Sequence, residues 1–247
     1  MTAPYRLHFG AIYAALGLVL GAAIATTIVL LVRDGPAEPP LWSTWRPVGD
    51  TDAKVSQISS FVSDEYKLPS GAQFAVVRAG APTDQGVPVA SYVIRRATAT
   101  QGNSFDTVSA KNSIVYTLSV CGLTQDCTKL SRPQAAAVTQ TLRRQALELA
   151  LYTFEYAGDV SSVMVDLPAL SENGASPAVF LQRSDVAAQI DRPLRFTLTP
   201  QAVFVPGLST AAEARRIDAL TVAHIYQHNV TQDPSGAPVI VLDPIQP

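Results

Sequence analysis

A continuous apolar segment near the N-terminus constrains the fold more than any other feature of this sequence. Residues 9–32 form a stretch of 24 residues without a charged side chain. As a helix this stretch would extend about 36 Å, enough to cross a hydrocarbon core of about 30 Å. A cleaved signal peptide is the alternative, since Ala23-Ile24-Ala25 has the form of a cleavage site, but the apolar region of a signal peptide is normally about 7–15 residues long. The sequence therefore predicts one N-terminal transmembrane helix that contacts the lipid bilayer along residues 9–32.

The predicted membrane helix divides the chain into four parts. They are a short cytoplasmic head at residues 1–8, the transmembrane helix at 9–32, a Pro-rich spacer at 33–50 and an extracytoplasmic domain at 51–247, with a subdivision near residue 158 as an alternative. The basic residues on the two sides of the helix are nearly balanced, so they do not set its orientation. A head of eight residues is small for a functional unit, and a pair of cysteines suits an oxidising compartment. We therefore expect a protein of the cell membrane with a cytoplasmic N-terminus and an extracytoplasmic domain.

Small side chains lie along one face of the predicted membrane helix. Gly17 and Gly21 are four residues apart, and Ala25 continues the row by one more turn. Residues of this size at this spacing allow two helices to approach closely. The pattern predicts a protein partner or a homo-oligomer in the membrane, although glycine and alanine are also common in membrane helices that do not associate.

The sequence of the domain predicts alternating groups of helices and strands. Apolar spacing and capping residues predict helices over 51–66, 131–158 and 210–222, the last opened by the capping box Thr210-Ala-Ala-Glu213. Runs rich in β-branched and aromatic residues predict strands over 74–78, 87–96, 113–120, 160–166, 178–182, 194–198 and 202–205, and a C-terminal hairpin of 224–231 with 239–242. The first three strands have short links and are expected to form an antiparallel meander, with a polar loop over 97–112. Trp42 and Trp45 are expected to hold the spacer against the domain.

This order of elements predicts an α+β fold. We expect a mainly antiparallel sheet with helices packed on it, in a cystatin-like or nuclear-transport-factor-like arrangement. The formal net charge is −2. A nucleic-acid-binding surface normally needs a clustered basic excess, so no nucleic-acid partner is expected. The arginine pairs at 95–96, 143–144 and 215–216 are interpreted as solvated faces.

The two cysteines, Cys121 and Cys127, are expected to form a disulfide. Their spacing is not the C-x-x-C of redox or zinc sites, and the chain lacks four nearby zinc ligands. A disulfide closing so small a loop would stabilise the fold by about 2–3 kcal/mol. Two free thiols are the alternative.

His224 and His228 are the weak candidates for metal ligands. Their spacing of four residues places both on one face of a helix or of a strand. The first histidine is not followed by the glutamate of zinc proteases, and a third ligand would have to come from a distant residue such as Asp218 or Asp233. Exposed polar residues on a terminal strand are the simpler interpretation.

No sequence motif for catalysis or cofactor binding stands out. The chain has no G-x-S-x-G nucleophile elbow and no glycine-rich phosphate loop. We therefore expect no cofactor, and an enzyme is not the favoured function.

Three segments carry a resemblance to a group of known proteins. YKLPSGAQFAVVRAG, VFLQRSDVAAQIDRPLRFTL and PVIVLDPI resemble uncharacterised, membrane-anchored proteins of actinobacterial type. The resemblance implies a bacterial envelope setting and transfers no activity. The leading hypothesis is a non-catalytic scaffold, accessory subunit or protein-interaction domain of the envelope. An extracytoplasmic ligand-binding or sensory domain, signalling through a lateral membrane partner, is the second hypothesis, and a surface hydrolase is the third.

Overall fold

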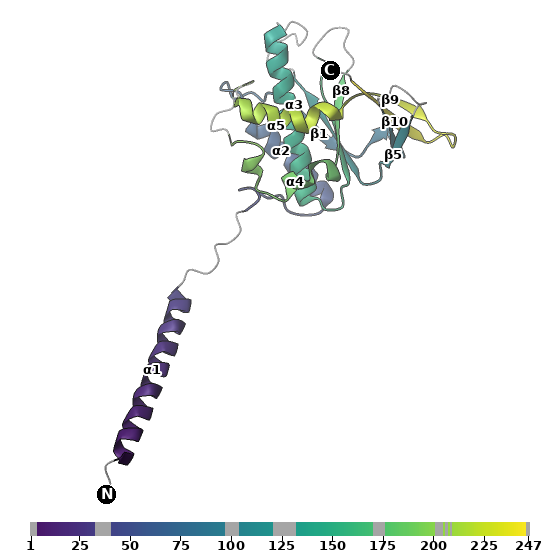
Figure 1. The fold of residues 1–247 in the computed structure, drawn as a ribbon. Coiled ribbons are helices and arrows are strands. Elements are labelled where there is room, and N and C mark those ends of the chain that lie inside the picture. Colours follow the sequence, from purple (N-terminus) through teal and green to yellow (C-terminus); the bar gives the residue numbers. More distant parts are fainter. Residues whose placement is uncertain are drawn as a thin grey trace. The chain divides into compact units, whose positions relative to one another are not determined.

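The chain divides into two units. The computed structural model describes residues 4–32, 41–96, 104–120, 132–169, 176–200, 205, 207 and 209–245. One unit is Met1–Leu41 and the other is Trp42–Pro247. The first contains the single helix α1, Pro4–Val32 (Figure 1), and the second contains all the other elements.

Helix α1 covers the segment for which a transmembrane helix is predicted. Among the residues with a described structure, no helix has both the length and the apolarity needed to cross a bilayer, which takes about 20 apolar residues in succession. On this finding the prediction of a transmembrane helix at residues 9–32 is wrong, and with it that part of the expected fold class. Gly17 and Gly21 lie in α1, and a Cβ added at either would meet no atom within 4 Å.

The second unit is built on one eight-stranded sheet with the order β1-β6-β7-β8-β9-β10-β4-β5. Its strands are β1 (Val76–Gly80), β4 (Ser91–Arg95), β5 (Phe105–Ser109), β6 (Ser113–Ser119), β7 (Ser162–Asp166), β8 (Pro177–Gln182), β9 (Ile225–Gln232) and β10 (Pro238–Pro244). The pairs β6–β7 and β4–β10 are parallel, and the other neighbours are antiparallel. A separate short hairpin joins β2 (Thr83–Asp84) to β3 (Val87–Pro88).

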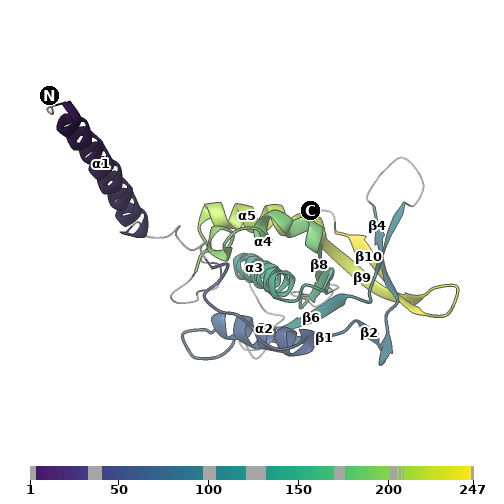
Figure 2. The same cartoon turned by 90° about the horizontal axis from the view of Figure 1, so that it is seen from below.

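Two longer helices and one shorter one cover one face of the sheet (Figure 2). They are α2 (Thr51–Glu65), α3 (Arg132–Tyr156) and α5 (Ala211–Thr221), with the short helices η1 (Arg183–Val186), α4 (Ala187–Ile190), η2 (Leu194–Phe196) and η3 (Val222–His224) between strands. Asp50 caps α2 by accepting a hydrogen bond from the Ala53 amide, and Thr210 caps α5 by accepting one from Glu213. These caps satisfy amides that the first helical turn leaves without partners.

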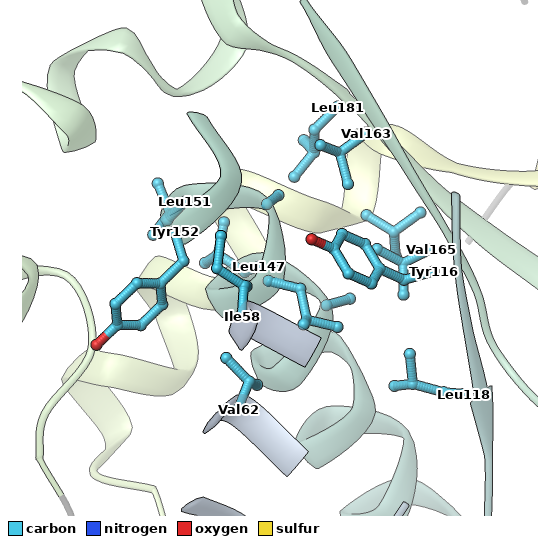
Figure 3. Packing of buried hydrophobic residues seen from close by; sticks show 14 of the residues in the cluster. Ile58, Val62, Tyr116, Leu118, Leu147, Leu151, Tyr152, Val163, Val165 and Leu181 are labelled. Atoms are coloured by element: carbon cyan, nitrogen blue, oxygen red, sulfur yellow. The ribbon is translucent and has the colours of Figure 1, made fainter. Parts of the chain in front are cut away.

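Helix α3 provides the centre of the main core. Leu147 and Leu151 of this helix pack between α2 and the sheet, where Val163 and Val165 project from β7 (Figure 3). The last turn of α3 is held by Arg183, whose guanidinium donates to the carbonyls of Phe154, Ala157 and Val160. Arg183 is the residue directly after β8, so these contacts fix the end of α3 against the β7–β8 region.

The opposite face of the sheet is concave and buries a second core. Tyr92 of β4 and Phe180 of β8 place their ring centroids 4.7 Å apart, although two strands lie between β4 and β8 in the sheet. In a flat sheet three strand spacings would separate these positions by about 14 Å. The sheet therefore curls strongly toward this face, where Met164, Ile240 and Leu242 complete the second core.

The expected helices agree with the structure, and the expected C-terminal hairpin is confirmed by the antiparallel pair β9–β10. The pairing expected for the first three strands differs from the structure, and most of the expected strand 202–205 lies outside the described residues. Strand β1 pairs with β6, whereas β4 pairs with β5 and, in parallel, with β10. The antiparallel meander is therefore wrong. The sheet is mainly antiparallel as expected, but it is mixed, because the pairs β6–β7 and β4–β10 are parallel. Strand β5 lies inside the segment expected to be a polar loop, and residues 194–196 form a short helix in place of a strand.

The tryptophans of the spacer pack on the domain as predicted. Trp42 and Trp45 lie against the main core, and the Trp45 ring stacks on Phe61 of α2 at 4.1 Å between centroids. Trp42 meets Tyr152 and Tyr156 of α3 edge-on. The domain therefore begins at Trp42, before the capped start of α2.

Candidate functional site

A row of polar side chains crosses the concave face near one end of the sheet. Arg78 of β1 lies opposite Thr117 of β6, and Thr117 lies opposite Asp166 of β7. Directly opposed residues on neighbouring strands project from the same face. His228 of β9 approaches the row from beyond β8, where the small side chain of Ala178 leaves space between β7 and β9.

The row forms part of a groove of about 330 Å³. Its floor is apolar and includes Val115, Met164 and Ile240, which belong to or pack on the second core. A second hollow, toward Leu167 and Ser176, is lined in common by Thr117, Asp166 and His228. These three side chains therefore stand between two hollows, where a bound group would meet them from either side.

The Asp166–His228 pair is the polar centre of the groove. The His228 Nε2 atom lies 3.8 Å from Asp166 Oδ1, which is beyond the range of a direct hydrogen bond. Asp166 Oδ1 and His228 Nδ1 are both buried and have no hydrogen-bond partner among the described residues. The pair thus presents an acceptor and an imidazole nitrogen that the protein itself leaves unused.

The carboxyl group of Asp166 is held in an environment that disfavours its charge. Burial raises the pKa of Asp166, while the charge of His228 and hydrogen bonding by Thr117 act in the opposite direction. A carboxylate that is partly desolvated without full compensation is a common feature of binding and catalytic sites.

Strand β1 closes one end of the groove and is an edge of the sheet. Among the described residues it pairs only with β6, so its outer side carries backbone groups without a sheet partner. A further hollow lies on its other face, between Val77–Ala81 and the α2 residues Asp52, Val55 and Ser59. The edge is therefore flanked by a hollow on each face of the sheet.

The two histidines named from the sequence do not form one site. His224 ends η3, and its Nδ1 atom lies 3.7 Å from Asp185, whereas His228 faces Asp166. In the described part of the chain no group of three or more histidine, cysteine, aspartate and glutamate side chains is placed to hold a metal. Cys121 and Cys127, the expected disulfide pair, lie outside the described residues.

A buried ionic network on the helix-covered face is a feature that the sequence did not reveal. Arg144 of α3 is 7% exposed and bonds Glu148, Glu213 and the Tyr66 hydroxyl. Tyr66 donates to Glu148 at 2.8 Å, and Glu213 also accepts from the Thr199 amide at 2.9 Å. Burial alone would lower the pKa of Arg144, but Tyr66, Glu148 and Glu213 raise it. The interpretation of this arginine as part of a solvated face is wrong.

The same network changes the expected capping box of α5. Thr210 accepts from the Glu213 amide as predicted, but the Glu213 carboxylate bonds Arg144 and Thr199. A glutamate at the third position of a capping box would instead return to the first residue of the box. Glu213 therefore joins α5 to α3.

Comparisons with protein-family models, with characterised proteins and with solved structures find no match to this chain.

Proposed function

We propose that residues 42–247 form a non-catalytic protein-interaction domain, and that its partner contributes an extended segment that adds to the outer side of β1. The observation that carries the proposal is a strand whose outer side has no sheet partner among the described residues, with a hollow on each face. When a peptide adds to a sheet edge, backbone hydrogen bonds supply affinity and hollows for alternate side chains supply specificity.

The side chains along β1 support docking at this edge. Four of its five residues are exposed, and Arg78 is a charged group that forms no ion pair among the described residues. A second copy of this chain is a less suitable occupant. If two β1 strands paired antiparallel about their centres, Arg78 would lie opposite Arg78, and like charges directly opposed destabilise a strand pair.

The other edge of the sheet, β5, is better protected. Arg96 binds Asp106 of β5 through two hydrogen bonds of 2.6 and 2.7 Å, and Arg95 lies over the Phe105 ring. On β5 the charge of Asp106 is already paired and the Phe105 ring is already contacted by Arg95. On β1 the one charged group, Arg78, has no ion pair among the described residues, and a hollow lies on each face of the strand. This contrast favours β1 over β5 as the docking edge.

A ligand-binding or hydrolytic role draws on the same groove but has less support. The hollows are open to solvent, whereas sites for small molecules usually enclose most of the ligand. Each of the two histidines faces one carboxylate, and among the described residues neither has a serine or threonine hydroxyl at hydrogen-bond distance. The envelope location and the resemblance to actinobacterial proteins remain predictions.

The proposal is tested by selecting binders from a displayed library of ten-residue peptides and locating them by amide hydrogen exchange. Binding should slow exchange within Val76–Gly80 and leave Phe105–Ser109 unchanged. Val76→Lys should weaken the selected peptides about tenfold, because lysine is a natural guard of strand edges. Phe105→Lys is the matched control, since Phe105 and Val76 are 45% and 46% exposed. Peptides that protect β5 or a helix instead of β1, or a library that yields no binder, would contradict the proposal.

A further inference from the structure

The concave groove contains buried polar atoms that the fold does not use, and they define a specific kind of ligand. We propose that Asp166 and His228 form a subsite for the cationic head of a lysine or arginine side chain from the partner protein. The assignment of the ligand to a protein rests on the proposed function, whereas the chemistry of the subsite rests on separate observations.

The first observation is the unused hydrogen-bonding capacity of the pair. Within the described part of the chain, Asp166 Oδ1 and His228 Nδ1 are buried without hydrogen-bond partners, and 3.8 Å separates Asp166 Oδ1 from His228 Nε2. A buried acceptor without a partner carries a free-energy cost that a donor from a ligand would remove. An ammonium or guanidinium group supplies several donors together with a positive charge that stabilises the carboxylate.

The second observation is the composition of the approach to the pair. Met164, Val115, Val230 and Ile240 line the groove beside Asp166. Lysine and arginine carry three or four methylene groups below the charged head, and these stems pack favourably on apolar surface. Met164 and Ile240 are almost fully buried, so the stem would pack on the two more exposed members, Val115 and Val230, beside the carboxylate.

The third observation is the distribution of charge along the groove. Arg78 also lines it, but it stands on the edge strand and makes no ion pair with Asp166. Asp166 is therefore not neutralised by Arg78 and remains free to pair with a cationic ligand, while Arg78 disfavours a cation at the rim. An anionic ligand would gain from Arg78 but would be repelled by Asp166 at the centre of the groove. The subsite selects a cation that reaches past the edge strand.

The His224–Asp185 pair provides a matched comparison within the same chain. His224 Nδ1 lies 3.7 Å from Asp185, a separation close to that of the His228 pair. Asp185, however, already accepts a hydrogen bond from the Gln182 amide at 2.8 Å, through the same oxygen that faces the histidine. A substitution at Asp185 therefore changes a similar histidine–carboxylate pair in which the carboxylate oxygen already accepts a hydrogen bond.

The test is a titration of the full chain with three probes, followed by NMR of the histidine ring nitrogens. The probes are the free amine agmatine, the peptide acetyl-Gly-Arg-Gly-amide and the same peptide with neutral citrulline in place of arginine. The arginine peptide should shift the His228 ring signals and leave those of His224 unchanged, and the citrulline peptide should bind at least about tenfold more weakly. Asp166→Asn should reduce arginine-peptide binding by a similar factor, whereas Asp185→Asn should leave it unchanged.

The results that would overturn the inference are equally specific. Equal binding of arginine and citrulline, an equal loss in Asp185→Asn, or the absence of any shift at His228 would each exclude a cation subsite. Tighter binding of agmatine than of the arginine peptide would exclude a protein side chain as the intended ligand.

The test separates this inference from the docking edge. Edge peptides that protect Val76–Gly80 and show no dependence on Asp166 would leave the docking edge intact and remove the subsite. Arginine-peptide binding at His228, combined with a library that yields no binder for β1, would support the cation subsite and exclude the docking edge.

Discussion

Arg144 and Asp166 are both largely buried charges, on opposite faces of one sheet, yet their surroundings differ completely. Arg144 bonds two glutamates, a tyrosine hydroxyl and the Thr199 carbonyl. Asp166 keeps one buried oxygen that has no hydrogen-bond partner among the described residues, and it meets His228 at 3.8 Å. A charge whose partners are all supplied by the fold serves stability, whereas a charge left incomplete has capacity for a ligand. The helix-covered face thus holds the fold together, and the concave face carries the candidate site.

The largest expected effect is on the closed network. Arg144→Met should lower the free energy of unfolding by about 3–5 kcal/mol, because it leaves Glu148 and Glu213 buried without their cation. Urea denaturation of the two proteins measures the difference. Arg143→Met is the control from the same helix: Arg143 is 15% exposed and pairs at 2.8 Å with Asp218, which is 46% exposed, so the carboxylate left unpaired stays in contact with water. A pair of that kind contributes about 1 kcal/mol or less, and equal losses in the two variants would contradict the role given to Arg144.

A smaller effect is expected where the spacer joins the helix-covered face. Trp45→Ala should destabilise the domain by about 2 kcal/mol, because it removes apolar area packed on Phe61 and Tyr152. Thermal unfolding measures the change. Val48→Ala in the same segment should stay within about 0.5 kcal/mol, since Val48 is 71% exposed. If Trp45→Ala had no effect, the domain would begin after Trp45.

The pH dependence of stability should be a still smaller effect and should come from the concave face. Burial raises the pKa of Asp166 in the folded state above its usual value of 3.8. A raised folded pKa gives stability that is present below the unfolded pKa and is lost as pH rises through the folded pKa. Asp166→Asn should therefore gain stability relative to the original protein as pH rises from 4 toward 7. His228 and Thr117 face Asp166 and lower its pKa. In a His228→Ala background the pKa of Asp166 should therefore rise further, and the stability gained by Asp166→Asn between pH 4 and 7 should be larger. A constant difference between pH 4 and 7 would contradict this assignment.

The sequence predicted the helices better than the sheet, for a physical reason. Helix periodicity is local, so Val55, Ile58 and Val62 identify the buried face of α2 without knowledge of the rest of the chain. Strand pairing depends on residues far apart in sequence. Strand β4 lies beside β10, more than a hundred residues later, and nothing in the local pattern of either strand specifies that partner.

The candidate site was missed because its signal is also non-local. Asp166 ends the apolar run of β7 and looks like an ordinary strand terminus until the curl of the sheet brings His228 beside it. Spacing identified His228 as a candidate but grouped it with His224, which faces a different carboxylate. The pair Arg143–Arg144 predicts a solvated face, because two adjacent arginines give no indication of which side chain points into the core.

The most direct test of the contrast between the two faces combines two measurements on Asp166→Asn: its free energy of unfolding in urea and its affinity for the arginine peptide. Asp166→Asn should unfold at the same or a higher urea concentration than the original protein, with a gain of up to about 1 kcal/mol, and should lose binding of the arginine peptide. A loss of about 3 kcal/mol or more, comparable to that expected for Arg144→Met, with binding retained, would show that Asp166 supports the fold and would contradict the account.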